Sequence, residues 1–137
     1  MSRQPLRAAA GAFVARQRVA HLATVGAGGE PHVVPVSTVL DADRLVFATQ
    51  ADTQKVRNLR GDPHVAMCFD EYTEEWSSLQ QVVVYGRARV VESGPEFMRD
   101  RNLLYESFEQ YETEAPIDEG ESVIVEVSMD RVSTMGF

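Results

Sequence analysis

The sequence contains little cysteine, lysine and tryptophan, with one residue of each, and no long apolar run. A single cysteine, Cys68, excludes an intramolecular disulfide framework and is typical of a reducing, cytoplasmic setting. No apolar stretch approaches the ~18 residues that a membrane-spanning helix needs, so no membrane partner is expected. The short apolar patch near the N-terminus lies between arginines, which favours an amphipathic helix over a secretory signal.

Basic residues are also scarce relative to acidic ones. The 137 residues include 13 lysines and arginines against 21 aspartates and glutamates, a formal net charge of −8. Residues 1–66 carry an excess of basic side chains, whereas residues 92–126 hold eleven acidic and two basic ones. Because nucleic-acid binding depends mainly on neutralising phosphates, no nucleic-acid partner is expected. The mildly basic first half can still receive a small anion.

Length and composition predict one globular domain over residues 1–137, with 44% hydrophobic and 25% charged residues. The hydrophobic pattern predicts an N-terminal helix over 4–18, barrel strands over 20–92 and 122–132, and a helix over 95–111. Strand-like segments joined by tight turns predict a mainly β fold with flanking helices, a six-stranded antiparallel barrel.

Two residues break the strand pattern in an informative way. Pro35 lies inside the predicted strand 31–40 and removes one backbone donor, which favours an edge, a bulge or a strand with one free side. Gly86 lies inside the long predicted strand 79–92 and indicates a bend or bulge.

The only lysine, Lys55, lies in a predicted short helix over 52–63. Asp52 is the expected N-cap, and Gly61 and Pro63 end the helix. A helix N-terminus carries partial positive charge, so helix physics does not account for a lysine in the first turn. An anion does, because the free N–H groups and the ammonium converge on it. The alternative is that Lys55 is a solvated surface residue.

Other reactive side chains show no pattern of ligands or of a catalytic triad. His21, His32 and His64 lie at strand starts in different segments and lack ligand spacing, so no metal site is predicted. Cys68 lies in an apolar strand and is interpreted as a small buried hydrophobic residue.

The order of motifs resembles a known family. The stretches HLATVGAGGEPHVVPVSTVLDADRLVFAT (21–49) and DTQKVRNLRGDPHVAMCFDEY (52–72) are similar to the split-barrel flavoproteins, the superfamily that includes pyridoxamine 5′-phosphate oxidase. The similarity runs from about residue 15 to the end. The stretch DEYTEEW (70–76) and the closing RVSTMGF (131–137) resemble the branch that depends on the deazaflavin coenzyme F420. That branch often has tryptophan where this chain has Met135.

The resemblance implies a six-stranded antiparallel split β-barrel, a homodimer and interfacial sites for FMN or F420, with DEYTEEW favouring F420. It implies three groups of cofactor-binding residues. They are Thr49, Gln50, Thr53 and Lys55, with Arg57 beside them, at the phosphate; Val36, Ser37 and Thr38 along the ring; and Trp76, Gln80 and Gln81 as candidates for a wall supplied by the partner.

The resemblance further implies a flavin- or deazaflavin-dependent oxidoreductase that transfers hydride to or from a small unsaturated or carbonyl substrate. No residue is assigned as acid or base, because the cofactor carries the chemistry. Pyridoxamine phosphate oxidases proper are longer and have a substrate-binding C-terminal segment without counterpart here, so that reaction is not expected. The alternative is a non-catalytic protein that binds or stores a flavin, haem or tetrapyrrole, in which a histidine would be the haem ligand.

Overall fold

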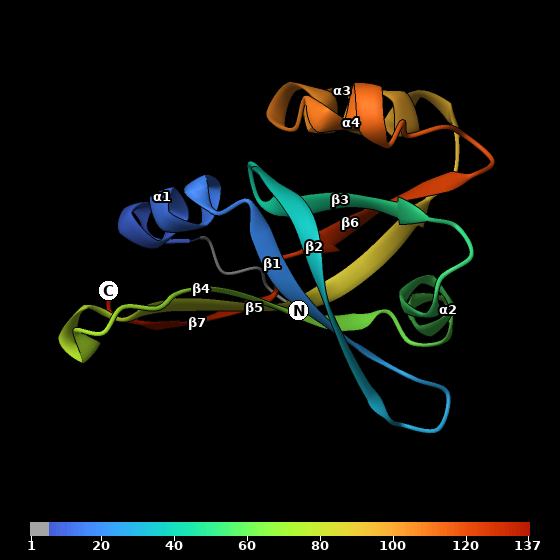
Figure 1. Ribbon diagram of the computed structural model, residues 1–137. Coiled ribbons are helices and arrows are strands. Elements are labelled where there is room, and N and C mark those ends of the chain that lie inside the picture. Colours follow the sequence, from blue (N-terminus) through green and yellow to red (C-terminus); the bar gives the residue numbers. More distant parts are fainter. Residues whose placement is uncertain (1–5) are drawn as a thin grey trace.

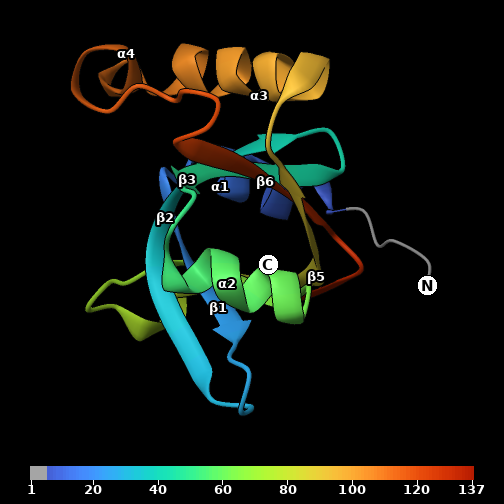
Figure 2. The same cartoon turned by 90° about the vertical axis from the view of Figure 1, so that its right-hand side faces the viewer.

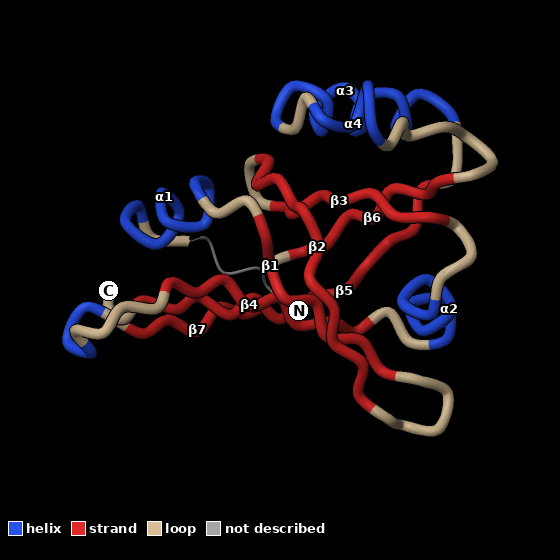
Figure 3. Tube along the Cα trace, viewed as in Figure 1, coloured by secondary structure: helices blue, strands red, loops and turns tan. Residues whose placement is uncertain are grey.

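A computed structural model describes residues 6–137; residues 4 and 5 of the predicted first helix lie outside the described residues. Strands form the body of the molecule and helices lie at its ends and over one face (Figures 1 and 3). None of the helices in the described part of the chain is long and apolar enough to cross a membrane. The elements are α1 (Ala8–Arg16), β1 (Val19–Val25), β2 (Pro31–Asp41), β3 (Arg44–Gln50), α2 (Gln54–Gly61), β4 (His64–Glu71), the 3₁₀ turn η1 (Trp76–Ser78), β5 (Gln80–Val91), α3 (Gly94–Ser107), α4 (Gln110–Glu114), β6 (Ser122–Ser128) and β7 (Arg131–Met135).

Six strands close an antiparallel barrel, as predicted. Their order is β4-β1-β2-β3-β6-β5, and β5 pairs back with β4. The seventh strand, β7, adds to β5 outside this ring and was not predicted as a separate strand. Full closure removes most free sheet edges, which otherwise invite pairing between chains.

Alternate strand residues point inward and fill the barrel. Leu22, Phe47 and Phe69 are fully buried there. At opposite ends of the barrel, α1 adds Phe13 and α2 adds Leu59 to the same core (Figure 1). Each short helix is therefore held by the apolar side chain it inserts, because helices this short are marginal on their own.

A second apolar layer lies outside the barrel, where α3 packs over β3 and β6. Its buried side chains include Phe97 and Leu104 of α3 and Ile124 of β6. An ion-pair network closes the edge of this layer: Arg44 lies 2.9 Å from Asp100 and 2.5 Å from Glu126. Burial alone would raise the pKa of Asp100, but its hydrogen bonds and the nearby arginines lower it overall.

The helix predicted over 95–111 is not continuous. It ends at Ser107, and Phe108 leaves the helical conformation with φ −134° and ψ 88° before α4 begins. The Phe108 ring is buried and meets Tyr111 edge to face, with centroids 5.9 Å apart. Burial of this ring in the second core thus accompanies the break, which helical spacing does not reveal.

The strand predicted over 122–132 is also interrupted, at Met129 and Asp130. β5 pairs with β6 through residues 88–91 and with β7 through residues 81–85, so the chain changes direction between the two strands. The predicted bend at Gly86 marks this crossing: a Cβ atom there would overlap the backbone carbonyl of Ser128.

This close approach predicts the effect of a single methyl group. Gly86→Ala should lower the free energy of unfolding by several kcal/mol or prevent folding, because backbone must move on both strands. Gly61→Ala is the control, since no described atom outside its chain neighbours and its own helix backbone lies within 4 Å of the point that its new methyl group would occupy. It should change stability by less than about 1 kcal/mol. Urea unfolding of both variants tests this, and equal stability of the two would contradict it.

Candidate functional site

The barrel is split where β2 parts from β3. β2 pairs with β1 over residues 31–37, but it pairs with β3 only over residues 38–41. At the far end of β3, residues 48–50 pair with β6 alone. The facing edges of β2 and β3 therefore carry backbone groups without strand partners, and this opening is the candidate site.

The alternation of the β1–β2 ladder shows which groups face the opening. The Gly26 N–H donates to the Glu30 carbonyl at 2.8 Å, which makes the even-numbered residues of β2 bond to β1. The backbone groups of Val33, Pro35 and Ser37 then point to the free edge. The missing N–H of Pro35 falls on this edge and removes no ladder bond, so the free side predicted from Pro35 is present.

The helix α2 lies across one end of the barrel, between β2 and β5 (Figure 2). It begins after Thr53, whose hydroxyl donates to the Gln50 carbonyl and does not cap the helix. The predicted Asp52 cap is wrong, because the Asp52 carboxylate pairs with Arg57 at 2.7 Å. The first N–H groups of α2 thus have no side-chain acceptor among the described residues, and they carry the positive end of the helix dipole.

Lys55 is the second residue of this helix and lies beside these N–H groups. Its side chain is half-buried, and no carboxylate pairs with it within residues 6–137. Desolvation by burial lowers the pKa of Lys55 below its ordinary value, and no opposite charge raises it. A half-buried, unpaired ammonium next to free helix N–H groups is an arrangement that binds an anion.

The other predicted phosphate residues lie around the same turn, with one exception. Thr49 is half-buried at the end of β3, and Gln50 is exposed. Thr53 keeps its hydroxyl near Gln50. Arg57 lies two residues beyond Lys55, on another face of α2, and its guanidinium is held by Asp52. We therefore place Arg57 outside the candidate site.

The three residues predicted along the ring do not share one face. Ser37 is half-buried on the outer side of β2, but Val36 and Thr38 point into the barrel and are 7% and 4% exposed. The Thr38 hydroxyl donates to the Val46 carbonyl. Their side chains are therefore not available to a ligand, which the period of two in a strand would have indicated, and their backbone groups point towards β1 and not to the free edge.

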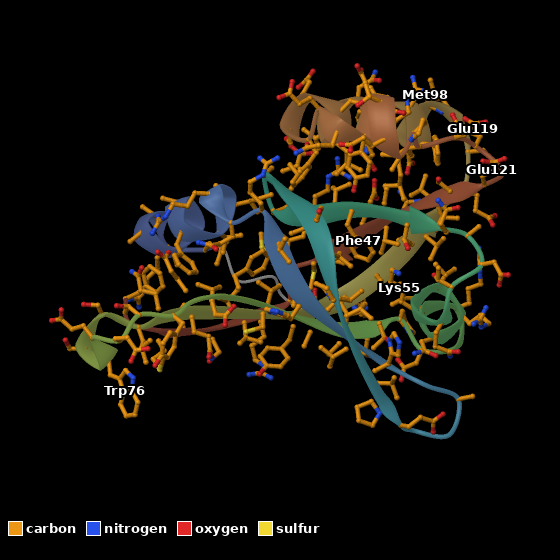
Figure 4. All side chains as sticks on the ribbon, in the orientation of Figure 1. Phe47, Lys55, Trp76, Met98, Glu119 and Glu121 are labelled. Carbon is orange, nitrogen blue, oxygen red and sulfur yellow. The ribbon has the colours of Figure 1, made fainter. Side chains whose placement is uncertain are left out.

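The predicted second wall is distant within one chain. β4, β5 and β7 extend beyond the barrel as a ribbon, and Trp76 lies at its tip, at the opposite end of the molecule from Lys55 (Figure 4). Trp76 is 73% exposed, and its indole N–H donates to the Tyr72 hydroxyl. Gln80 and Gln81 begin β5 in the same ribbon. A single chain does not bring these residues to the opening.

Sequence reasoning missed Arg18 and Tyr111, which line a cleft beside Ser37. Arg18 stands between a helix and a strand and carries no motif, and Tyr111 is the last residue of the predicted helix 95–111. Among residues 6–137, no group of three or more histidine, cysteine or acidic side chains is placed to hold a metal ion.

The sequence and the fold of this chain are similar to those of known proteins. The family model described as pyridoxamine 5′-phosphate oxidase matches residues 6–136. A curated relative, the 5a,11a-dehydrotetracycline/5a,11a-dehydrooxytetracycline reductase of Streptomyces rimosus subsp. rimosus, is 34% identical over 87 residues. That alignment covers 60% of this chain and 61% of the relative, less than two thirds of its length.

Solved structures share the fold over nearly the whole chain. The haem storage protein HutZ from Vibrio cholerae superposes with a TM-score of 0.82 at 17% identity, covering 98% of this chain and 97% of HutZ. An F420 reductase superposes with a TM-score of 0.70 at 25% identity, covering 89% of this chain and 94% of that protein.

The environment of Lys55 predicts that it does not stabilise the fold. At neutral pH its charge is disfavoured by desolvation and by the helix dipole, so Lys55→Met should keep the free energy of unfolding within about 1 kcal/mol of the wild type or above it. Arg44→Met should lower it by about 3–5 kcal/mol, because Asp100 is left buried without its partner. Denaturant unfolding distinguishes the two, and a larger loss at Lys55 would contradict a binding role.

Proposed function

The chain belongs to the pyridoxamine 5′-phosphate oxidase family, and from this premise we propose that it is a flavin- or deazaflavin-dependent oxidoreductase. The observation that carries the proposal is the meeting of a free strand edge with an uncapped helix N-terminus and an unpaired lysine. Two relatives are named as reductases, and the F420 reductase is 25% identical over most of this chain. They support reduction of an organic substrate, with F420 favoured over FMN.

The residues present fit a phosphate-bearing cofactor. Its phosphate would bind the first N–H groups of α2 and the Lys55 ammonium, with Thr49 and Thr53 beside them. Its flat ring would lie along the free edge of β2, where the backbone of Val33 and Ser37 offers N–H donors and carbonyl acceptors. Pro35 offers a carbonyl only, which leaves room for a ring edge at that point.

The cofactor, when bound, would supply hydride transfer to or from a carbonyl or conjugated substrate. The chain's own residues would bind and orient it: Lys55 holds one end, the β2 edge aligns the other, and the barrel wall excludes water from one ring face. Among residues 6–137, no side chain at the opening is assigned as a proton donor, so the proton that accompanies hydride would come from solvent.

We place the second face of the site in a second copy of the chain. In the described part of the chain, no helix covers the outer side of β1, β4, β5 and the first part of β2, whereas α4 lies above the upper part of β2 (Figures 1 and 2). This side carries Val19 and Val33, which are 46% and 61% exposed, and the half-buried Cys68, Val83 and Tyr85. An uncovered apolar sheet face of this kind is typical of a homodimer interface.

In such a dimer, the ribbon of one chain would reach the opening of the other. Trp76, Gln80 and Gln81 then become candidates for the wall opposite β2, which they cannot form in their own chain. An exposed indole offers a flat apolar surface to a ring system.

Haem or tetrapyrrole storage without turnover is the rival function. The three histidine rings differ in whether an acidic partner lies beside them. His21 lies 3.7 Å from Asp70, and His64 lies 2.8 Å from Asp62. His32 is half-buried, and its Nδ1 atom has no hydrogen-bond partner among the described residues. Its ring is therefore the most available of the three as a haem ligand. The similarity to HutZ is one of fold.

The cofactor assignment predicts selective retention. The purified protein is incubated separately with F420, FMN and haemin, desalted and examined by absorbance. We expect F420 or FMN to remain bound, and Lys55→Met to weaken that binding at least about tenfold because a charge-assisted hydrogen bond is lost. Arg60→Met, in the same helix and paired with Glu92, is the control. Retention of haemin alone would overturn the assignment in favour of storage.

The affinity for the cofactor should also depend on pH. The pKa of Lys55 is lowered in the free protein, and a bound phosphate would raise it again. The dissociation constant should therefore increase as the pH rises towards the ordinary range of lysine, because the ammonium of the free protein loses its proton below that range. The Lys55→Met variant should lack this increase, and a variant that kept the wild-type pH profile would contradict the role of Lys55.

The dimer is tested separately. Val33→Asp places a charge on the uncovered face and should shift the protein from dimer to monomer in sedimentation velocity, with loss of cofactor affinity. Met98→Asp, at a 37% exposed position on α3, is the control and should stay dimeric. A wild-type monomer that binds the cofactor tightly would refute the interfacial site.

A further inference from the structure

A second hollow lies beside Ser37, on the outer side of the barrel and beneath α4. It encloses about 280 Å³ and adjoins a neighbouring hollow of about 350 Å³, and Arg18 and Phe108 line both. Figure 2 shows α4 above the upper part of β2, and Gln110, Tyr111 and Glu114 of α4 line this hollow. Ser37 links the two sites, because its backbone faces the free edge of β2 while its side chain lines the cleft.

Arg18 is the cationic group of this cleft. Its guanidinium lies over the Phe108 ring, 4.2 Å from the centroid, and this stacking orients the planar group. No carboxylate pairs with Arg18 in the described part of the chain, although six other arginines there form ion pairs. Its N–H donors are therefore available to an anion in the cleft.

Aromatic rings supply the apolar walls. Phe108 is buried and Tyr111 is half-buried, and the two rings meet edge to face. Desolvation raises the pKa of Tyr111, which keeps its hydroxyl protonated at neutral pH. Flat apolar walls beside a stacked guanidinium favour a planar ligand over a flexible one.

Glu114 limits the charge that the cleft accepts. It is exposed, lines the same hollow as Arg18 and forms no ion pair with it among residues 6–137. A ligand with one negative charge next to Arg18 can keep clear of this carboxylate, whereas a phosphate dianion would meet its repulsion. The cleft is thus chemically different from the Lys55 end of the opening.

We propose that this cleft is the substrate site of the proposed reaction and that it selects a planar conjugated carbonyl compound with one negative charge, bound by Arg18, which Phe108 orients, and packed against Tyr111. The inference rests on the proposed function, because the ligand must lie against a ring held along β2. In the reducing direction the substrate gains a hydride at an electrophilic carbon and a solvent proton on the adjacent carbon, and the reduced cofactor is oxidised by two electrons.

The test uses two probes of nearly equal size and different charge. Equilibrium dialysis measures binding of 2-hydroxy-1,4-naphthoquinone, which is anionic at neutral pH, and of the neutral 2-methoxy-1,4-naphthoquinone to the protein without cofactor. The wild type should prefer the anion. Arg18→Gln should weaken binding of the anion about tenfold and change binding of the neutral probe by less than about twofold.

Two further variants sharpen the result. Glu114→Gln should tighten binding of the anion, because a repulsive charge is removed. Arg101→Gln removes an arginine stacked over Tyr105, 5.4 Å from its centroid and outside the cleft, and should change neither affinity. Equal wild-type affinity for the two probes, or an equal loss for both in Arg18→Gln, would overturn the proposal.

Cofactor binding shows whether a negative result overturns the substrate site alone or the proposed function as well. Arg18→Gln should bind F420 or FMN as the wild type does, and in turnover it should raise KM for the anionic quinone more than it lowers kcat. Normal cofactor binding without any dependence on Arg18 would overturn the substrate site alone. Selection of the anion by a protein that binds neither cofactor would overturn the substrate role with the proposed function.

Discussion

The parting of β2 from β3 is the constraint on which the rest of the molecule depends. Because β2 pairs with β3 only over residues 38–41, its first seven residues pair with β1 alone, and the barrel has an opening. α2 lies across one end of the barrel and inserts Leu59 into the core. The opening leaves backbone donors and acceptors exposed on one strand edge, beside the N-terminus of this helix. A closed ladder at this place would remove the candidate site.

Two cations in this protein show how the surroundings decide between a structural and a functional role. Arg44 is satisfied by Asp41, Asp100 and Glu126, so its charge holds α3 on the barrel. Lys55 is half-buried with no carboxylate beside it, and its pKa is lowered in consequence. A cation that the fold does not neutralise is available to a ligand. The pairing of each cation, more than the acidic net charge of the chain, therefore locates the proposed anion site.

The sequence predicts the helices and strands well, because turn and helix-ending residues and the spacing of apolar residues are local signals. The barrel and the bend at Gly86 followed from these signals. The sequence does not predict which of several possible partners a polar side chain binds. Asp52 is a good N-cap by type, yet Arg57 binds its carboxylate. The break at Phe108 depends on burial of a ring in a core formed by strands far away in the sequence. Of the three β2 residues predicted to line the ring, only Ser37 faces outward, which strict strand alternation would have indicated. Arg18 belongs to no motif and emerges only from its place beside Phe108.

Residue-resolved amide hydrogen exchange, with and without saturating F420 or FMN, tests the central claim most directly. The account predicts that the cofactor protects the amides of Val33 and Ser37 on the free edge of β2 and the first N–H groups of α2, at Gln54 and Lys55. These groups have no backbone partner in the free protein, so their exchange reports ligand contact. Saturating binding without protection at these positions would contradict the account.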